Sequence, residues 1–367
     1  MKKLSLLLTA ALLVLALAGC SNAAAPAETA VQAETAVQAE TIMQAETAAK
    51  AQAADSETES QELAASQTTD TLIRIGGLKG PTTMGLVKLM DQSAKGEALN
   101  NYEFTMVTAA DELTALIAGG KVDIALLPAN LSAVLYQKTQ QNISVIDINT
   151  LGVLYLVSAD ASLEENSLES LKGKTVYLPG KGTTPEYALR HLMNKAGLSD
   201  SDVTLEFKSE ATEVASILAE EPEAIGLLPQ PFATVAMMQN DKLSLVADLS
   251  AIWDSVSSDS QLVTGVTIVS NDFLAEHEDL VKTFLTEHEA SIQFAIDNPK
   301  TASELIVDAG IVAKAPIALK ALDSCHIAYL EGAEMKEALS GYLNTLFEQN
   351  PASVGGALPD DAFYYMP

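Results

Sequence analysis

The sequence is poor in basic residues: 21 lysines and arginines stand against 49 aspartates and glutamates, and the formal net charge is −28. Sequence-independent binding to DNA or RNA needs a basic surface, so we expect no nucleic-acid partner. Two cysteines cannot build a disulfide framework, and four scattered histidines leave little material for a metal site. Aromatics are few at 5%, yet 48% of the 367 residues are hydrophobic. That fraction is enough for a sizeable core, and the length predicts two or three compact units.

Residues 1–20 are typical of a lipoprotein signal peptide. Two lysines give a positive start, and an apolar run follows over residues 4–18. The run is shorter than the roughly 20 residues that a membrane span needs, which favours a signal peptide. It closes on LAGC at 17–20, which resembles a bacterial lipobox. The resemblance implies a lipid on Cys20, and the alternative is an ordinary secretory signal with a chance cysteine.

Residues 21–70 have a different composition. The hexapeptide AETAVQ at 27–32 recurs at 33–38 and, with changes, at 39–44 and 45–50. A period of six matches neither 3.6 nor 3.5 residues, so these repeats present no steady apolar helix face. We expect a disordered tether rich in alanine, glutamate, threonine and glutamine.

From residue 71 the patterns of strand and helix alternate. DIALLP at 123–128 is a nearly continuous apolar run, typical of a parallel strand with helices on both faces. Strands are expected at 72–78, 102–108, 123–128, 144–149, 151–158, 175–179, 203–208, 224–229, 243–249 and 262–270. One helix is expected to begin at Thr82 or Thr83 and to include Met84, Val87 and Met90, and another is expected from about 130 to about 139. Further helices are expected at 111–120, 186–196, 210–220 and 231–239, and over most of the chain after 272.

Two stretches of the chain parallel each other. DIALLPAN at 123–130 matches AIGLLPQP at 224–231, and LKGPTT at 78–83 matches PGKGTTP at 179–185. Two similar α/β halves predict two lobes. In open parallel sheets, ligands bind beyond the carboxyl ends of the strands, where helix starts offer free backbone N–H groups. We therefore expect a ligand pocket between the lobes.

The order of the motifs resembles a known family. It includes IRIGGLKGPTTMGLVKLM at 73–90, GKGTTPEYALRHLM at 180–193 and GGALPDDAFYYMP at 355–367, together with the two paired strands. The chain resembles the solute-binding lipoproteins of ABC importers, in the nitrate/sulfonate/taurine-like branch of the type II periplasmic-binding fold. The resemblance covers essentially all of residues 71–367.

The resemblance implies an α/β fold with two Rossmann-like lobes joined by two crossing strands, near 151–158 and 262–269. The last hundred residues would return to the first lobe. The expected domains are a signal peptide (1–20), a tether (21–70), lobe 1 (71–155 and 265–367) and lobe 2 (156–264).

The family's binding loops map onto turns that follow strands. The same glycines, prolines and threonines also serve ordinary turns and helix caps, which is the alternative interpretation. The expected ligand-binding residues are Lys79, Gly80, Pro81, Thr82, Thr83, Pro128, Asn130, Asn149, Gly182, Thr183, Thr184 and Gln230.

Motifs that would indicate catalysis are incomplete. GKT at 173–175 lacks the earlier glycine of a phosphate-binding loop and leads into a strand, and no Gly-x-Ser-x-Gly elbow occurs. Cys325 and His326 are neighbours that point apart on a helix, so burial is favoured over a nucleophile–base pair. Trp253 either stacks on an aromatic ligand or packs near the hinge. We expect no catalytic residue, no metal and no cofactor.

The resemblance implies a substrate-binding lipoprotein and not an enzyme. It would capture a small solute, either a sulfonate, nitrate or taurine-like anion, which Lys79 and Lys181 suit, or a thiamine-precursor-like heterocycle. Its partners would be an ABC permease and the ATPase subunit. We expect a monomer, lipid-anchored on the extracytoplasmic face of the bacterial cell membrane. The alternatives are an enzyme of the same fold, of the menaquinone-precursor or pyrimidine-precursor type, and a surface sensor.

Overall fold

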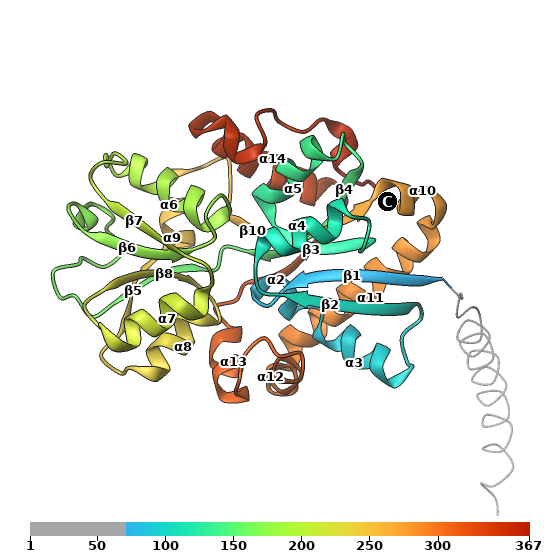
Figure 1. Cartoon of the computed structure of the whole chain (residues 1–367), viewed down its shortest axis with the longest axis horizontal. Helices are drawn as coiled ribbons and strands as arrows, with labels where there is room; N and C mark the ends of the chain where they lie inside the picture. The colour runs from blue at the N-terminus through green and yellow to red at the C-terminus, as the bar shows by residue number, and fades with distance from the viewer. Residues whose placement is uncertain (1–70) are drawn as a thin grey trace, which may run out of the picture. The chain divides into compact units, whose positions relative to one another are not determined.

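The computed structural model describes residues 71–367, which form two β-sheets with helices packed on their faces (Figure 1). The predicted signal peptide, the predicted tether and Cys20 lie outside the described residues. No helix within residues 71–367 is both long enough and apolar enough to cross a membrane.

Six strands form the first sheet: β1 (Leu72–Leu78), β2 (Asn101–Val107), β3 (Ile124–Pro128), β4 (Ile143–Leu151), β10 (Val263–Ser270) and β11 (Ile327–Leu330). Their order is β11-β4-β10-β3-β1-β2. β1 pairs in parallel with β2 and β3, whereas β10 is antiparallel to both β3 and β4. The parallel strands therefore end at one shared edge, which is the place for a ligand in this class of sheet.

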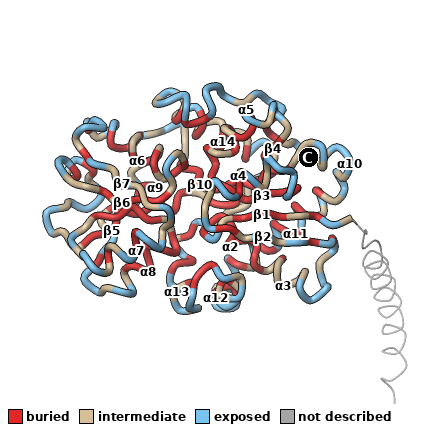
Figure 2. Tube along the Cα trace, in the orientation of Figure 1, coloured by how far each residue is buried: buried red, intermediate tan, exposed pale blue. Residues whose placement is uncertain are grey.

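Helices cover both faces of the first sheet (Figure 1). Along β3, Ala125 and Leu127 pack into the same core as α4 (Ala110–Ala118), α5 (Ala129–Lys138) and α14 (Gly332–Gln349). Ile124 and Leu126 point to the other face, against α3 (Val87–Lys95) and α11 (Glu278–Asp297). Successive side chains of a strand point to opposite faces, so burial on both sides explains why DIALLP contains no polar alternation (Figure 2).

The second sheet contains β5 (Leu154–Ser158), β6 (Thr175–Pro179), β7 (Thr204–Lys208), β8 (Ile225–Pro229) and β9 (Ser244–Asp248). Their order is β7-β6-β8-β5-β9, with β6 parallel to β7 and β8, and β5 antiparallel to β8 and β9. α6 (Thr184–Lys195) and α9 (Leu249–Val256) cover one face, and α7 (Ala211–Glu220) and α8 (Phe232–Gln239) cover the other. The predicted α/β fold with two sheets is confirmed.

The chain passes from the first sheet to the second through Gly152 and Val153, which separate β4 from β5. It returns between α9 and β10. The segment before β11 holds the first crossing, because Leu151 N–H donates to the His326 carbonyl at 3.0 Å and the His326 ring contacts the Gly152 carbonyl. Tyr155 also donates its hydroxyl to the Ser324 carbonyl at 3.1 Å. The passage between the sheets is thus tied to the last third of the chain.

Replacing Gly152 with alanine should destabilise the protein by about 1–3 kcal/mol, the usual range for overpacking. A Cβ atom at this position would lie 2.1 Å from Ser250 Oγ and 3.1 Å from Leu262 Cδ2. Denaturant unfolding of Gly152→Ala, Ser250→Gly and the double variant measures the effect. We expect Ser250→Gly to recover most of the loss in the double variant. Equal stability of Gly152→Ala and the wild type would contradict this account of the crossing.

Three local features differ from the sequence prediction. The helix expected after Thr82 is broken at Gly85 and Leu86 into α2 (Pro81–Met84) and α3. A Cβ at Gly85 would lie 2.6 Å from Ile292 Cγ1 of α11, so packing against α11 requires glycine at the break. α9 and β11 were not predicted, and β11 begins after His326, which has a positive φ of 42°. The remaining helices are α10 (Asn271–Glu276), α12 (Pro299–Asp308), α13 (Ala315–Leu322) and short 3₁₀ turns at Glu169–Leu171, Pro351–Val354 and Asp361–Phe363.

Candidate functional site

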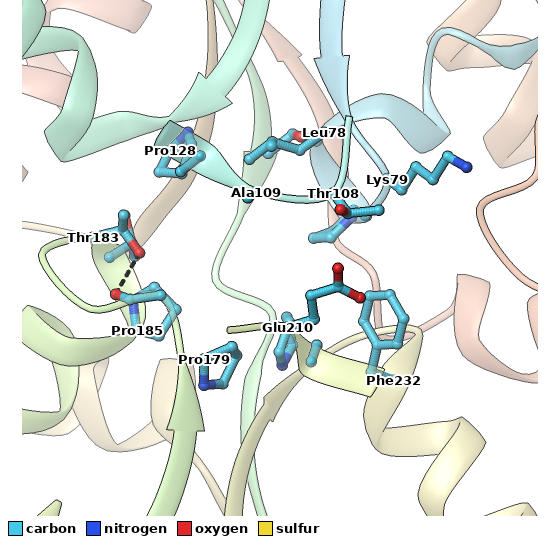
Figure 3. Close-up of a pocket in the computed structure, with 18 of the residues that line it drawn as sticks. Leu78, Lys79, Thr108, Ala109, Pro128, Pro179, Thr183, Pro185, Glu210 and Phe232 are labelled. Atoms are coloured by element: carbon cyan, nitrogen blue, oxygen red, sulfur yellow. Dashed lines mark hydrogen bonds between the residues drawn. The ribbon is translucent and has the colours of Figure 1, made fainter. Parts of the chain in front are cut away.

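A cavity of about 250 Å³ lies where the strand ends of the two sheets face each other (Figure 3). Each parallel strand contributes to its wall. β1, β2 and β3 of the first sheet supply Lys79, Thr108 and Pro128 at or just after their carboxyl ends, and β6 and β8 of the second supply Pro179 and Pro229. The topology itself therefore positions the site.

Seven of the residues expected from the sequence to bind a ligand line this cavity. These residues lie at strand ends and helix starts, as the loop pattern predicted. The seven are Lys79, Gly80, Pro81, Thr82, Pro128, Thr183 and Thr184. Their role in binding a ligand stays a prediction.

The other five predicted residues lie away from the cavity wall. Thr83 donates its hydroxyl to the Leu78 carbonyl at 2.6 Å, and Gln230 Oε1 accepts the Thr234 hydroxyl at 2.9 Å. Asn149 donates to Thr267 Oγ1 at 3.1 Å. These three side chains are buried in internal hydrogen bonds and hold the surrounding turns and strands together.

Asn130 and Gly182, the remaining two, join the two halves of the structure. Asn130 at the start of α5 donates to the Gly182 carbonyl at 3.2 Å and to the Ser353 carbonyl at 3.0 Å. The Thr184 hydroxyl donates to Asn130 Oδ1 at 3.4 Å and accepts from the Tyr342 hydroxyl at 3.3 Å. These bonds run between the α5–α14 side and the start of α6, beside the cavity.

Three wall segments were missed by the sequence prediction. Thr108–Ala110 follows β2, Ser209–Thr212 follows β7, and Gly310–Ile311 lies between α12 and α13. The rule that ligands bind beyond the carboxyl ends of parallel strands applies equally to the expected strands at 102–108 and 203–208. The position of these two loops after predicted strands was a usable signal. They were missed because they lack the glycine, proline and threonine composition of the predicted binding loops.

The wall is mainly apolar and rich in proline. Within the described residues, Lys79 and Glu210 are its charged members. Figure 3 shows the Glu210 carboxylate pointing into the space near Thr108 and Phe232, whereas the Lys79 side chain extends away from it. Prolines from both sheets line the wall: Pro81, Pro128, Pro179, Pro185 and Pro229.

Two wall threonines carry unsatisfied hydroxyls. Thr82 and Thr264 are buried, and within residues 71–367 neither Oγ1 atom has a hydrogen-bond partner. Buried polar atoms without partners are uncommon, and each needs a specific explanation. Their place on the cavity wall makes these two hydroxyls candidates for contact with an occupant.

Trp253 does not line the cavity. It is fully buried, its ring centroid lies 4.6 Å from that of His191 on α6 and 5.6 Å from that of Tyr342 on α14, and its Nε1 donates to the Ser260 carbonyl at 3.1 Å. Burial lowers the pKa of His191 to about 4, helped by the charge of Lys195. The tryptophan therefore packs at the junction of the two halves, and the packing alternative holds.

Cys325 and His326 lie beyond α13, which ends at Leu322, so the expectation that they stand on a helix is wrong. The Cys325 thiol is buried against Met84 Sδ at 3.6 Å, and burial raises the pKa of the thiol. His326 is exposed and contacts the crossing at Gly152. The predicted burial of Cys325 is therefore confirmed. A buried, protonated thiol is a poor nucleophile.

A protein-family model described as NMT1/THI5 like matches residues 103–302, more than half of the chain. The chain belongs to the NMT1/THI5-like family. No curated protein matches it. The matched region runs from β2 into α12 and so includes most of the cavity wall and all of the second sheet.

Solved structures resemble this NMT1/THI5-like chain over most of its length. It is 25% identical, with a TM-score of 0.66, to an ABC transporter from Parabacteroides distasonis, and the match covers 81% of this chain and 99% of that one. The periplasmic aliphatic sulphonate binding protein SsuA from Escherichia coli is 14% identical at a TM-score of 0.64, covering 82% and 93%. The alkanesulfonate-binding protein SsuA from Xanthomonas axonopodis pv. citri, bound to MOPS, is 14% identical at 0.62, covering 80% and 96%. The fold is that of periplasmic binding proteins, and the predicted resemblance is confirmed.

Proposed function

We propose that this chain is the substrate-binding protein of an ABC importer and binds a small solute between its two lobes. The observation that carries the proposal is the cavity, whose wall is built from strand ends of both sheets. Its volume of about 250 Å³ is below the 300–1,000 Å³ typical of sites for drug-sized ligands, which favours a small solute. The similarity to the ABC transporter protein from P. distasonis, which is 25% identical, supports the same function.

Binding and closure are coupled in this proposal. The two lobes are the units built on the first and the second sheet, and they move about the segments that join β4 to β5 and α9 to β10. A solute that touches both walls favours the arrangement in which the walls are close. The hydrogen bonds of Asn130 with Gly182 and of Thr184 with Tyr342 span the halves beside the cavity and stabilise that arrangement.

The extracytoplasmic location belongs to the same proposal. Cys20 carries a lipid, residues 21–70 tether the lobes, and the protein delivers its solute to a membrane permease driven by a separate ATPase subunit. Tethering raises the effective concentration of the binding protein at the permease. The anchor holds the protein to the membrane surface without spanning it.

The test is a thermal-shift screen of the full chain against anionic, neutral and cationic small metabolites, followed by fluorescence of Trp253, the single tryptophan. A solute at about 100 times its Kd should stabilise the native state by about 2.7 kcal/mol. Because Trp253 contacts both α6 and α14, closure should change its emission. The solute should be recovered chemically unchanged.

Ala109→Phe should fill the cavity and abolish the shift, because Ala109 lies on its wall. Ala161→Phe is the matched control, since Ala161 is exposed and away from the cavity. Equal binding by Ala109→Phe and the control would place the solute elsewhere. No stabilisation by any compound would contradict the proposed function, and conversion of a bound compound would favour an enzyme.

A further inference from the structure

The charge on the cavity wall is unevenly placed. Glu210, the residue before α7, directs its carboxylate into the cavity, whereas the exposed Lys79 directs its ammonium group away (Figure 3). Neither side chain forms an ion pair within the described residues. The Glu210 carboxylate accepts one hydrogen bond, from the Thr212 hydroxyl to Oε2 at 3.1 Å. Its remaining acceptor capacity faces the space that a solute would fill.

Four helix starts around the cavity, those of α6, α7, α8 and α2, have N–H groups that are missing or already used. At α6, Pro185 has no N–H, and the Gly182 N–H already donates to the carboxylate of Glu186 at 2.8 Å. At α7, the Ser209 N–H donates to the carboxylate of Glu213 at 3.2 Å. Free N–H groups and a positive helix end are what attract anions. Here, acidic side chains already occupy part of that capacity.

N–H groups are also used or missing at the starts of α8 and α2, whereas α4, which begins at the wall residue Ala110, has no side-chain cap. At α8, the Thr234 N–H donates to Gln230 Oε1 at 3.2 Å. α2 opens on Pro81, which lacks an N–H, and the Thr83 N–H donates to the Gly80 carbonyl at 3.3 Å. Lys181, the second lysine expected to favour an anion, lies over the ring of Phe207 at 5.7 Å and is not on the wall.

We infer that the cavity selects a small, largely apolar molecule that presents a positively charged or N–H-donating nitrogen to Glu210, and that it discriminates against sulfonates and carboxylates. This inference rests on the proposed binding function. The carboxylate forms a charge-assisted hydrogen bond with such a nitrogen, roughly twice as strong as a neutral one. An anionic group would instead meet an unpaired like charge, and such a pairing rejects the wrong ligand. Phe232 and the prolines contact the apolar part.

The experiment uses matched compounds on benzene, pyridine and pyrimidine rings, each carrying an aminomethyl or amidine, hydroxymethyl, carboxylate or sulfonate group. Dissociation constants for the full chain are measured by calorimetry at low salt. We expect the amines and amidines to bind at least tenfold more tightly than the anions on the same ring. Glu210→Gln should weaken the amines about 10- to 100-fold, as loss of a hydrogen bond to a charged group does, while hydroxymethyl compounds change little.

Glu220→Gln is the control, because it makes the same charge change at the exposed far end of α7. It should leave all constants unchanged. Tighter binding of sulfonates or carboxylates, or amine binding that Glu210→Gln does not weaken, would overturn the inference and leave the proposed function intact. No binding of any compound in the full metabolite screen would instead contradict the proposed function. If Glu210→Gln fails to fold, the preference of the wild-type protein for amines and amidines over anions on the same ring still tests the inference.

Discussion

Replacing Trp253 with alanine is expected to lower the free energy of unfolding by about 3–5 kcal/mol, the usual cost of deleting a large buried aromatic side chain. Trp253 is 0% exposed and packs between His191 and Tyr342. Its loss would leave a cavity at the junction of α6, α9 and α14, and would remove the donor to Ser260. Denaturant unfolding followed by circular dichroism measures the change, because the variant has no tryptophan fluorescence.

Trp253→Phe is the matched control, since it keeps an aromatic ring and should lose less stability than the alanine variant. A solute that binds the wild type should still bind Trp253→Phe, because Trp253 is not on the cavity wall. If Trp253→Ala unfolded like the wild type but lost solute binding, Trp253 would be a ligand-stacking residue after all.

Replacing Asp147 with alanine should destabilise the protein by a similar amount, about 3–5 kcal/mol, because breaking a buried pair leaves its partners unsatisfied. Asp147 on β4 is 0% exposed; its Oδ2 lies 3.0 Å from His288 Nδ1, and its Oδ1 accepts the Thr267 hydroxyl at 2.7 Å. Removing the carboxylate would leave the Thr267 hydroxyl and His288 Nδ1 without this buried hydrogen-bond partner. Denaturant unfolding gives the free energy.

The control for this prediction is Asp361→Ala, which removes a carboxylate 2.8 Å from Lys336 at a side-chain exposure of 91%. A surface pair of this kind contributes about 0–1 kcal/mol. The double variant Asp147→Ala with His288→Ala should be less destabilised than the sum of the single variants, since residues in direct contact couple. Additive losses would mean that the pair does not act as a unit.

The sequence patterns were sufficient to predict most strands and the two-sheet fold. DIALLP at 123–128 and AIGLLP at 224–229 contain β3 and β8, as predicted. A short apolar run bounded by turns is too short for a typical helix and therefore indicates a buried strand. β11 was missed because its four residues lie within a stretch of helical patterning, and it gains its pairing from β4, which is more than 170 residues earlier. Such long-range pairing leaves no local signal.

The site was predicted at the level of loops and less well at the level of side chains. A turn such as 78–83 can be placed at the cavity from its position after a strand, but which side chain points inward depends on local rotation. Thr82 therefore lies on the wall, whereas its neighbour Thr83 donates its hydroxyl to the Leu78 carbonyl. Glu210 was missed because a glutamate before a helix is ordinary at a surface, and only the opposing sheet makes it face a cavity.

The prolines that line the cavity have a consequence for how tightly a solute can be held. Proline fixes its own φ angle and restricts the residue before it, and five such residues belong to the wall. Much of the ordering that a flexible loop undergoes when it binds is therefore complete before a solute arrives. Preorganised sites lose less conformational entropy on association, so each half of the wall is a preformed template, and adaptation by the protein is confined to the movement of one lobe against the other.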